Sequence, residues 1–100
     1  MAAKPIDKWT SNTVVWIADS DPYQYDYREA YPWEVAEVKK FPNPSIYGGK
    51  NIYDSNYGLL GTDLKAVLRE KIKLCRNELD GAKSSIGYAI RNLQEEIQNL

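Results

Sequence analysis

The stretch from residue 62 to residue 100 constrains the fold of this chain most, because its apolar residues recur at alternating spacings of three and four. Since about 3.6 residues make one helical turn, this spacing places them on one stripe of an α-helix. With Ile72 at heptad position a, the residues of this stripe are Leu68, Ile72, Cys75, Leu79, Ala82, Ile86, Ala89 and Leu93. Large residues at position a and small residues at position d let two helices approach closely. We therefore expect a tight helical seam.

The length of the stripe leaves two interpretations of its role. It could cover the protein's own sheet, as most amphipathic helices do, or it could seal a homo-oligomer. A single helix of this length spans roughly 58 Å at ~1.5 Å per residue, which exceeds what a sheet built from the remaining residues can cover. We favour the homo-oligomer, with the stripe residues as its interface.

A second choice concerns the continuity of this helix. Glycine is common just beyond a helix C-terminus, so the stretch could be a hairpin of two shorter helices broken near Gly81. The heptad register, however, runs through this point without a slip, which a loop would not require. We favour one long helix, bent near Gly81, over the hairpin.

The part of the chain before this stretch has the pattern of a small antiparallel sheet. One hundred residues make one domain, with an N-terminal arm at residues 1–12, a sheet with loops at residues 13–61 and the helical oligomerisation region at residues 62–100. Strands are predicted at residues 13–19, 20–27 and 31–41, and a hairpin about Gly48 and Gly49 within residues 45–53. Residues 54–61 are predicted as a polar loop. The fold class is therefore α+β.

Two of these predicted strands carry informative side chains. Residues 13–19 place Val15 and Ile17 on one face and further apolar residues on the other, which indicates a central or covered strand. In residues 20–27 tyrosines alternate with polar residues, so an extended chain presents them on one face, as half-buried packing or as a surface for a base or a partner protein. Arg28 follows directly and suits either a phosphate or a salt bridge to Glu29.

Composition excludes several classes of function. The chain has one cysteine and no histidine, which excludes zinc sites and Cys-His nucleophiles and removes the commonest general base. Cys75 lies on the helical stripe, so we expect it to be a buried packing residue. A net charge of −1 gives no basic footprint for duplex nucleic acid. We expect no enzyme activity, no metal and no cofactor.

The sequence also bears on location. It contains no long apolar run and no pattern typical of a signal peptide. A single cysteine suits a reducing compartment. We therefore expect a cytoplasmic protein without a membrane partner.

The junction at residue 62 is the most informative local feature for ligand binding. Thr62 is a good N-cap, and Asp63 suits the positive end of the helix dipole. Helix N-termini attract phosphate through free N–H groups, and Lys65 and Arg69 follow within the next two turns. The sequence has neither a Walker lysine motif nor a dinucleotide glycine pattern. The junction is thus either an ordinary capped helix start or part of an anion site.

Several segments together resemble a known class of proteins. They are the Glu- and Val-rich segment WEVAEVKKF, a glycine-containing hairpin, the approach YGLLGTD, and the heptad stretch with Leu68, Leu79, Ile86 and Leu93. This pattern of elements, over residues 33–100, resembles small phage- and prophage-encoded counter-defence proteins, in particular the phage anti-Thoeris sponge family. The resemblance implies an oligomer of small sheets and long helices. It also implies binding of a cyclic nucleotide or cyclic ADP-ribose-type immune signal at a subunit interface, without hydrolysis.

A site of this kind would draw residues from several elements. The residues that we expect to contact the ligand are Arg28, Tyr53, Asn56, Thr62, Lys65 and Arg69. In this hypothesis Arg28 and Arg69 pair with phosphates, and Tyr53 stacks on a base. Thr62 and the preceding loop amides complete the phosphate site.

Two other classes of function fit the same sequence. An anti-CRISPR-like inhibitor of a bacterial defence system would use the helix only for dimerisation and present a tyrosine face to a host protein. The residues of that face are Tyr23, Tyr25, Tyr27 and Tyr31. A phage assembly factor would use the helix as a coiled-coil adaptor. An inhibitor should co-purify with one host protein, a sponge should be stabilised by a nucleotide, and an adaptor should only oligomerise.

Overall fold

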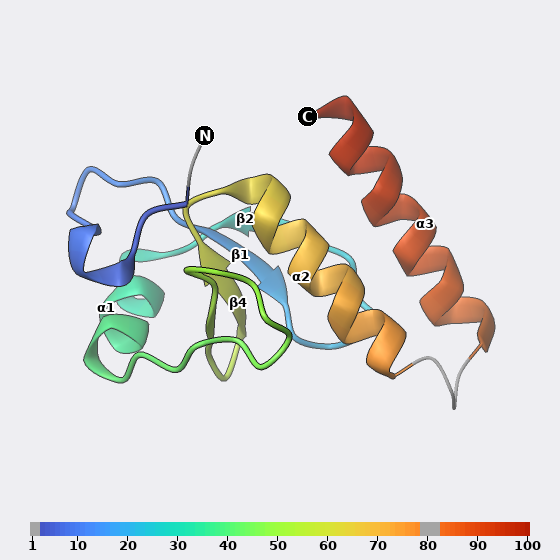
Figure 1. Ribbon diagram of the computed structural model, residues 1–100, viewed down its shortest axis with the longest axis horizontal. Coiled ribbons are helices and arrows are strands. Elements are labelled where there is room, and N and C mark those ends of the chain that lie inside the picture. Colours follow the sequence, from blue (N-terminus) through green and yellow to red (C-terminus); the bar gives the residue numbers. More distant parts are fainter. Residues whose placement is uncertain (1–2, 79–82) are drawn as a thin grey trace.

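A four-stranded antiparallel sheet lies at the centre of the protein, in a computed structural model that describes residues 3–78 and 83–100 (Figure 1). The elements in chain order are η1 (Ile6–Lys8), β1 (Trp16–Asp19), β2 (Tyr27–Glu29), α1 (Pro32–Lys40), β3 (Tyr53–Asp54), β4 (Gly58–Gly61), α2 (Leu64–Asn77) and α3 (Lys83–Asn99). The strand order is β2-β1-β4-β3. The predicted α+β class with a small antiparallel sheet is confirmed.

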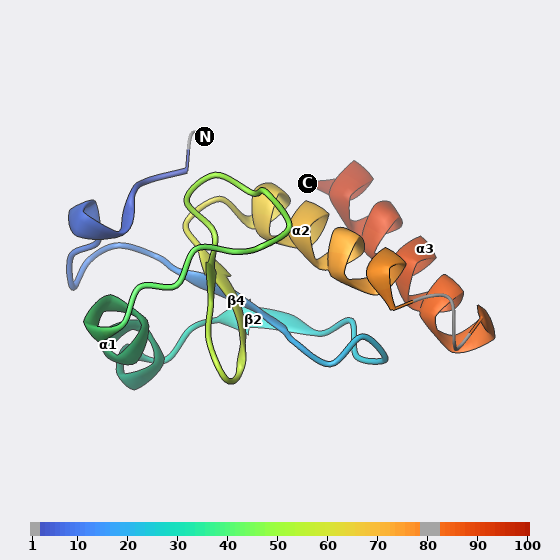
Figure 2. The same cartoon turned by 60° about the horizontal axis from the view of Figure 1, so that its bottom comes forward.

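Strand β1 is central, as the apolar residues on both its faces predicted. Val15 and Ile17 pack on one face of the sheet with Val38 of α1. Ala18 packs on the opposite face with Val67 of α2. Because successive side chains of a strand point to opposite faces, β1 contributes to two separate apolar clusters, and helices α1 and α2 cover opposite faces of the sheet (Figure 2).

The heptad stretch forms two helices, and the predicted single long helix is wrong. Helices α2 and α3 lie side by side, and Leu100 returns to a hollow that it shares with Leu64 at the start of α2 (Figure 1). A stripe that continues in register on both sides of a turn can fold back on itself, because the two halves then face each other. Gly81, where the sequence allowed a break, lies outside the described residues.

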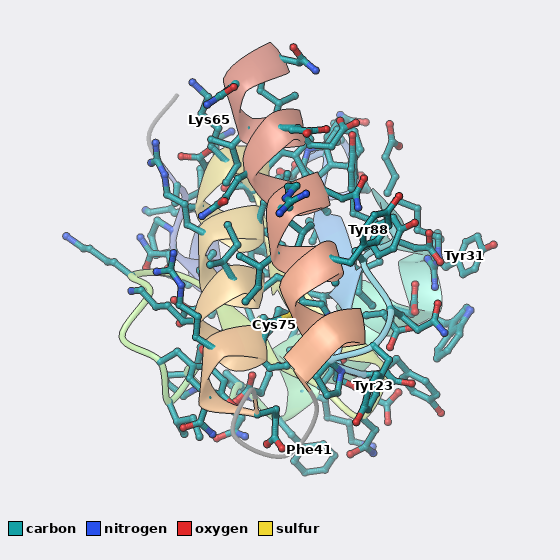
Figure 3. All side chains as sticks on the ribbon, turned by 90° about the vertical axis from the view of Figure 1, so that its right-hand side faces the viewer. Tyr23, Tyr31, Phe41, Lys65, Cys75 and Tyr88 are labelled. Carbon is teal, nitrogen blue, oxygen red and sulfur yellow. The ribbon has the colours of Figure 1, made fainter. Side chains whose placement is uncertain are left out.

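The stripe residues expected at an oligomer interface are used inside one chain instead. Leu68, Ile72, Cys75 and Leu93 form a cluster between α2 and α3, and Ala89 is completely buried. Figure 3 shows Cys75 between the two helices. The small side chains at position d do permit close helix packing, but within the hairpin. Leu79 and Ala82 lie outside the described residues, as does the side chain of Ile86. The described part of the stripe is therefore buried within one chain.

Residues 31–41 form helix α1, so the strand predicted there is wrong. Pro32 occupies the first helical turn, where its fixed φ fits and its missing N–H costs nothing. The side chain of Glu34 accepts a hydrogen bond from the N–H of Tyr31 at 2.8 Å, which is half of a capping box. Val35 and Val38, three residues apart, then pack on the same side against the sheet.

Residues 54–61 form part of a β-hairpin, so the polar loop predicted there is also wrong. Strand β4 is completely buried between β1 and β3. Gly58 is required there, because a Cβ at this position would lie 2.2 Å from the carbonyl oxygen of Ala18. In the turn, the Ser55 hydroxyl accepts from the N–H of Gly58 at 3.0 Å.

The hairpin predicted within residues 45–53 is confirmed in outline. The N–H of Ser45 donates to the carbonyl of Ile52 at 2.9 Å, and Pro44 bridges to Tyr53. Gly48, with φ of 89°, lies in the intervening loop. This loop completes the edge of the sheet at β3.

Two buried charged side chains of α2 attach loops to the helix. Lys71 is completely buried, and its ammonium group donates to the backbone carbonyls of Asp19 and Asp21. Burial lowers the pKa of Lys71. The Glu70 carboxylate accepts from the N–H of Gly49 at 2.7 Å, and a Cβ on Gly49 would lie 2.6 Å from the Glu70 carboxyl carbon.

Candidate functional site

The residues expected to bind a nucleotide do not come together. Tyr53 is buried in the core, where its ring meets Trp9 edge-on at 5.5 Å and its hydroxyl accepts from the N–H of Ile6 at 3.3 Å. It therefore has a structural role and no free face for a base. Arg69 is exposed on α2, and Arg28 lies on β2 at an edge of the sheet.

The remaining candidates line separate hollows. Thr62 and Lys65 share a hollow of about 300 Å³ at the start of α2, whereas Asn56 lines another, of about 270 Å³, with Glu37 and Asp54. The side chains of Glu37 and Asp54 make the second hollow unfavourable for an anion. Burial raises the pKa of Asp54.

The expected N-cap at Thr62 is wrong as well. Asp63 is the N-cap of α2, and the Thr62 hydroxyl accepts from the N–H of Lys4 at 2.8 Å. Thr62 thus holds the N-terminal segment against the start of the helix. The side chain of Asp63 makes no capping hydrogen bond, but its carboxylate adds negative charge near the start of the helix, which disfavours a phosphate there.

A different set of side chains forms the most distinctive surface of the protein. Tyr31, Trp33 and Tyr57 are each about half exposed. The Trp33 ring stacks on Tyr31 at 6.5 Å and meets Tyr57 edge-on at 5.1 Å between ring centroids. The guanidinium of Arg28 lies 4.2 Å from the centre of the Tyr31 ring, within range of a cation–π interaction. We call these four residues the aromatic surface.

A buried carboxylate fixes the arginine of this surface. The two terminal nitrogens of the Arg28 guanidinium donate to Glu34, at 2.7 Å and 2.9 Å, and Glu34 is 2% exposed. Glu34 also accepts from the N–H of Tyr31. The hydrogen bond from Arg28 lowers the pKa of Glu34, and the same bond raises the pKa of Arg28. The pair therefore stays ionised and holds the start of α1 against β2.

The tyrosines expected to share one face are divided between two places. Tyr23 and Tyr25 lie in the loop between β1 and β2, and the Tyr25 ring meets Tyr88 of α3 at 6.5 Å between ring centroids. Tyr27 is half-buried, and its hydroxyl donates to Glu96 at 2.9 Å, which raises the pKa of Tyr27. Tyr31, the fourth tyrosine of the predicted face, belongs to the aromatic surface.

The sequence interpretation missed Trp33 and Tyr57 as surface partners. In the strand predicted at residues 31–41, Trp33 would share one face with Val35. The sequence signal for a helix was present in Pro32 and in the spacing of Val35 and Val38. Tyr57 is brought to Trp33 only by the β3–β4 turn, for which the sequence gives no local signal.

Three further observations concern the cysteine, the metal-binding types of side chain and the helices. Cys75 is buried, as predicted, and burial raises the pKa of its thiol, so it is protonated at neutral pH. Within residues 3–78 and 83–100, no three side chains of the metal-binding types come together. None of the helices in these ranges is long and apolar enough to cross a bilayer.

The resemblance to the sponge family rests on a pattern of elements, and two of those elements differ from the pattern. The segment WEVAEVKKF is helical in α1, and YGLLGTD contains the buried strand β4. The family assignment and its nucleotide ligand stay predictions. Comparison with models of known protein families, with curated proteins and with solved structures finds no match.

Proposed function

We propose that this protein is a non-enzymatic binding module that recognises a partner protein through the aromatic surface. The observation that carries the proposal is a rigid arginine, fixed by a buried carboxylate, surrounded by three exposed aromatic rings. Tryptophan, tyrosine and arginine are the residues most enriched at the energetic centres of protein interfaces. Their grouping supports a protein partner, and a bacterial defence protein is the partner in the alternative function that the sequence also fits.

The rigidity of the aromatic surface favours binding. Arg28 already has its geometry set by Glu34, and the Trp33 ring is supported by rings on both sides. Side chains that are ordered before binding lose less conformational entropy on association. A partner therefore gains the contact area of the rings at low entropic cost.

The same contacts argue against a nucleotide at Arg28. Both terminal nitrogens of its guanidinium are directed to a buried carboxylate, so a phosphate would have to compete with an ion pair that is already formed. The other expected ligand residues line different hollows or the core, and Arg69 is exposed on α2. A nucleotide sponge would need a second copy to bring these residues together.

The test is capture of partner proteins from host lysate by the wild-type protein and by Trp33→Ala. A Phe41→Ala variant is the matched control, because Phe41 is an exposed aromatic residue that follows α1 but lies outside the aromatic surface. A protein retained by the wild type and the control should bind Trp33→Ala about 30-fold more weakly, as expected for an energetic centre. Equal binding by all three forms would refute the proposal.

Thermal unfolding with cyclic nucleotides and cyclic ADP-ribose isomers tests the competing function. A ligand at ~100 times its dissociation constant stabilises a protein by about 2.7 kcal/mol. Such a shift, with the nucleotide recovered intact, would favour a sponge. A flat response together with Trp33-dependent capture would favour the protein-binding module.

A further inference from the structure

The outer edge of β2 carries backbone groups that face away from the sheet. On one side of the strand, the carbonyl of Asp26 accepts from the N–H of Asp19 at 3.3 Å. On the other side, the N–H of Ala30 donates to the carbonyl of Val15 at 2.7 Å. Because alternate residues of an antiparallel strand direct their backbone groups to opposite sides, those of Tyr27 and Glu29 point outward. The carbonyl of Glu29 already accepts from the Arg28 guanidinium at 3.1 Å, so an added strand would share that oxygen with Arg28 and pair with the N–H of Glu29. In the part of the chain that the structure describes, the sheet ends at β2.

Helix α3 extends over the position beside this edge. Helix α2 packs over β1 and β4, through the cluster of Ala18, Leu59 and Val67. Packed helices lie about 8–10 Å apart and strands about 4.8 Å apart, so α3 is displaced from α2 by roughly two strand positions. It therefore lies above β2 and the vacant position beyond it. Tyr27 of β2 packs against the α2–α3 cluster, in agreement with this placement.

The space between the edge of β2 and α3 is acidic. A hollow of about 280 Å³ is lined by Tyr25, Asp26, Tyr27, Asn92, Glu95, Glu96 and Asn99. Three of these residues are carboxylates, and none is basic. The Tyr27 hydroxyl donates a hydrogen bond to Glu96, which leaves the charge of the carboxylate in place, and Glu95 and Asp26 are exposed. A positively charged segment would complement this end of the edge.

The opposite end of the edge is more apolar. A hollow of about 580 Å³ begins at Glu29 and Ala30, and its walls include Val14 and Val35. Val14 is 49% exposed although it is a β-branched residue next to a central strand. Polar residues 10–13 and Lys39 also line this hollow, so the acidic hollow at the other end is the one that favours a positively charged segment.

We propose that β2 receives a lysine- or arginine-bearing extended segment of the partner protein as a fifth strand, paired with Tyr27 and Glu29 and covered by α3. This rests on the proposed function, since the partner is the same protein that contacts the aromatic surface. Backbone pairing supplies affinity in such strand addition, and the alternating side chains supply specificity. Arg28 and Glu29 on the edge select against purely apolar strands.

The first experiment uses a synthetic octapeptide of alternating lysine and valine, with a glutamate–valine octapeptide as the matched control. In an extended peptide, alternation places the lysines on one face. In an NMR titration, the lysine peptide should shift the amide proton signals of Tyr27 and Glu29 and protect these protons from exchange with water. The glutamate peptide should do neither. Glu95→Lys should weaken this binding about fivefold, while Glu37→Lys, on α1, should leave it unchanged.

Backbone methylation separates strand pairing from simple charge attraction. One lysine peptide is N-methylated at its odd residues and another at its even residues. Because alternate amides face the edge, only one of the two should lose binding. Equal binding by both peptides, loss of binding by both, or no shift at Tyr27 and Glu29 would overturn the proposal.

The two proposals fail in different ways. If capture of the partner protein depends on Trp33 but not on Glu95, the binding module stands and strand addition is refuted. If capture is independent of Trp33, the proposed function fails, whatever the peptides show. In that case a peptide that binds to β2 shows only that the edge is open. The inference that the partner protein supplies the added strand fails together with the proposed function.

Discussion

Replacement of Leu93 by alanine tests whether the α2–α3 seam lies within one chain. Leu93 is 1% exposed and packs with Leu68, Ile72 and Cys75. At fully buried sites a Leu-to-Ala change costs about 3–5 kcal/mol, from lost transfer free energy and the cavity that remains. For a domain of this size, each kcal/mol lowers the Tm by about 4–8 °C, so we expect a decrease of at least about 12 °C.

Leu100→Ala is the matched control for this measurement. Leu93 and Leu100 both occupy heptad position a, but Leu100 is 51% exposed. In an uninterrupted coiled coil both leucines would contribute to the seam, whereas in the hairpin the Leu100 variant should unfold within about 0.5 kcal/mol of the wild type.

Thermal unfolding followed by circular dichroism, at two protein concentrations about a hundredfold apart, completes this test. A seam within one chain gives a Tm that does not depend on concentration, because no association accompanies folding. Equal losses for the two variants, with a wild-type Tm that rises with concentration, would refute the reasoning and place the seam between chains.

Three further predictions concern stability. Gly87→Ala should stabilise the protein by about 0.5–1 kcal/mol, since Gly87 lies inside α3 and an added Cβ meets no atom within 4 Å; urea denaturation measures the gain. Gly49→Ala should cost about 1–3 kcal/mol by displacing the Glu70 carboxylate from its backbone partner, and this loss should shrink when Glu70 is already alanine. Glu34 has a pKa below its ordinary value of 4.5, so its contribution to stability is present above pH 4.5 and is lost as the pH falls through the pKa of the folded state. Denaturation at a series of pH values should therefore show this acid-dependent loss in the wild type and its absence in Glu34→Gln.

The elements with a clear period were predictable from the sequence. Residues around Val15 and Ile17 alternate and are β-branched, and they form a central strand. The apolar stripe between Leu68 and Leu93 is helical, as its spacing indicated. The direction of the chain after the first half of the stripe could not be predicted, because a heptad register is the same for a continuous helix and for two helices that face each other.

Short elements were not predictable, because tertiary contacts decide them. Residues 33–41 contain alternating and helical spacings together, and the hydrogen bond from Tyr31 to Glu34 favours the helix. Strand β4 consists of two leucines between glycines, which by composition resembles a turn. The ring contact of Trp33 with Tyr57 depends on both of these elements, so the aromatic surface could not be assembled from sequence spacing alone.

The candidate ligand residues show the same limit. Arg28 was predicted to contact a ligand because it follows a run of tyrosines, and it does lie on the aromatic surface. Its partner, Glu34, is six residues away and becomes adjacent only when β2 is followed directly by a helix. Tyr53 was chosen as a stacking residue, but the packing of Trp9 against its ring gives it a structural role.

The buried ammonium group of Lys71 makes this side chain an internal reporter of motion. Amine-reactive reagents modify accessible amines, so exposed lysines such as Lys40 and Lys73 should react at once. Lys71 can react only after α2 separates from the carbonyls of Asp19 and Asp21. Its labelling rate, read by mass spectrometry, therefore measures how often the loop before Tyr23 leaves the helix. A rate equal to that of global unfolding would make this loop part of the most stable core, and a faster rate would make it a unit that opens alone.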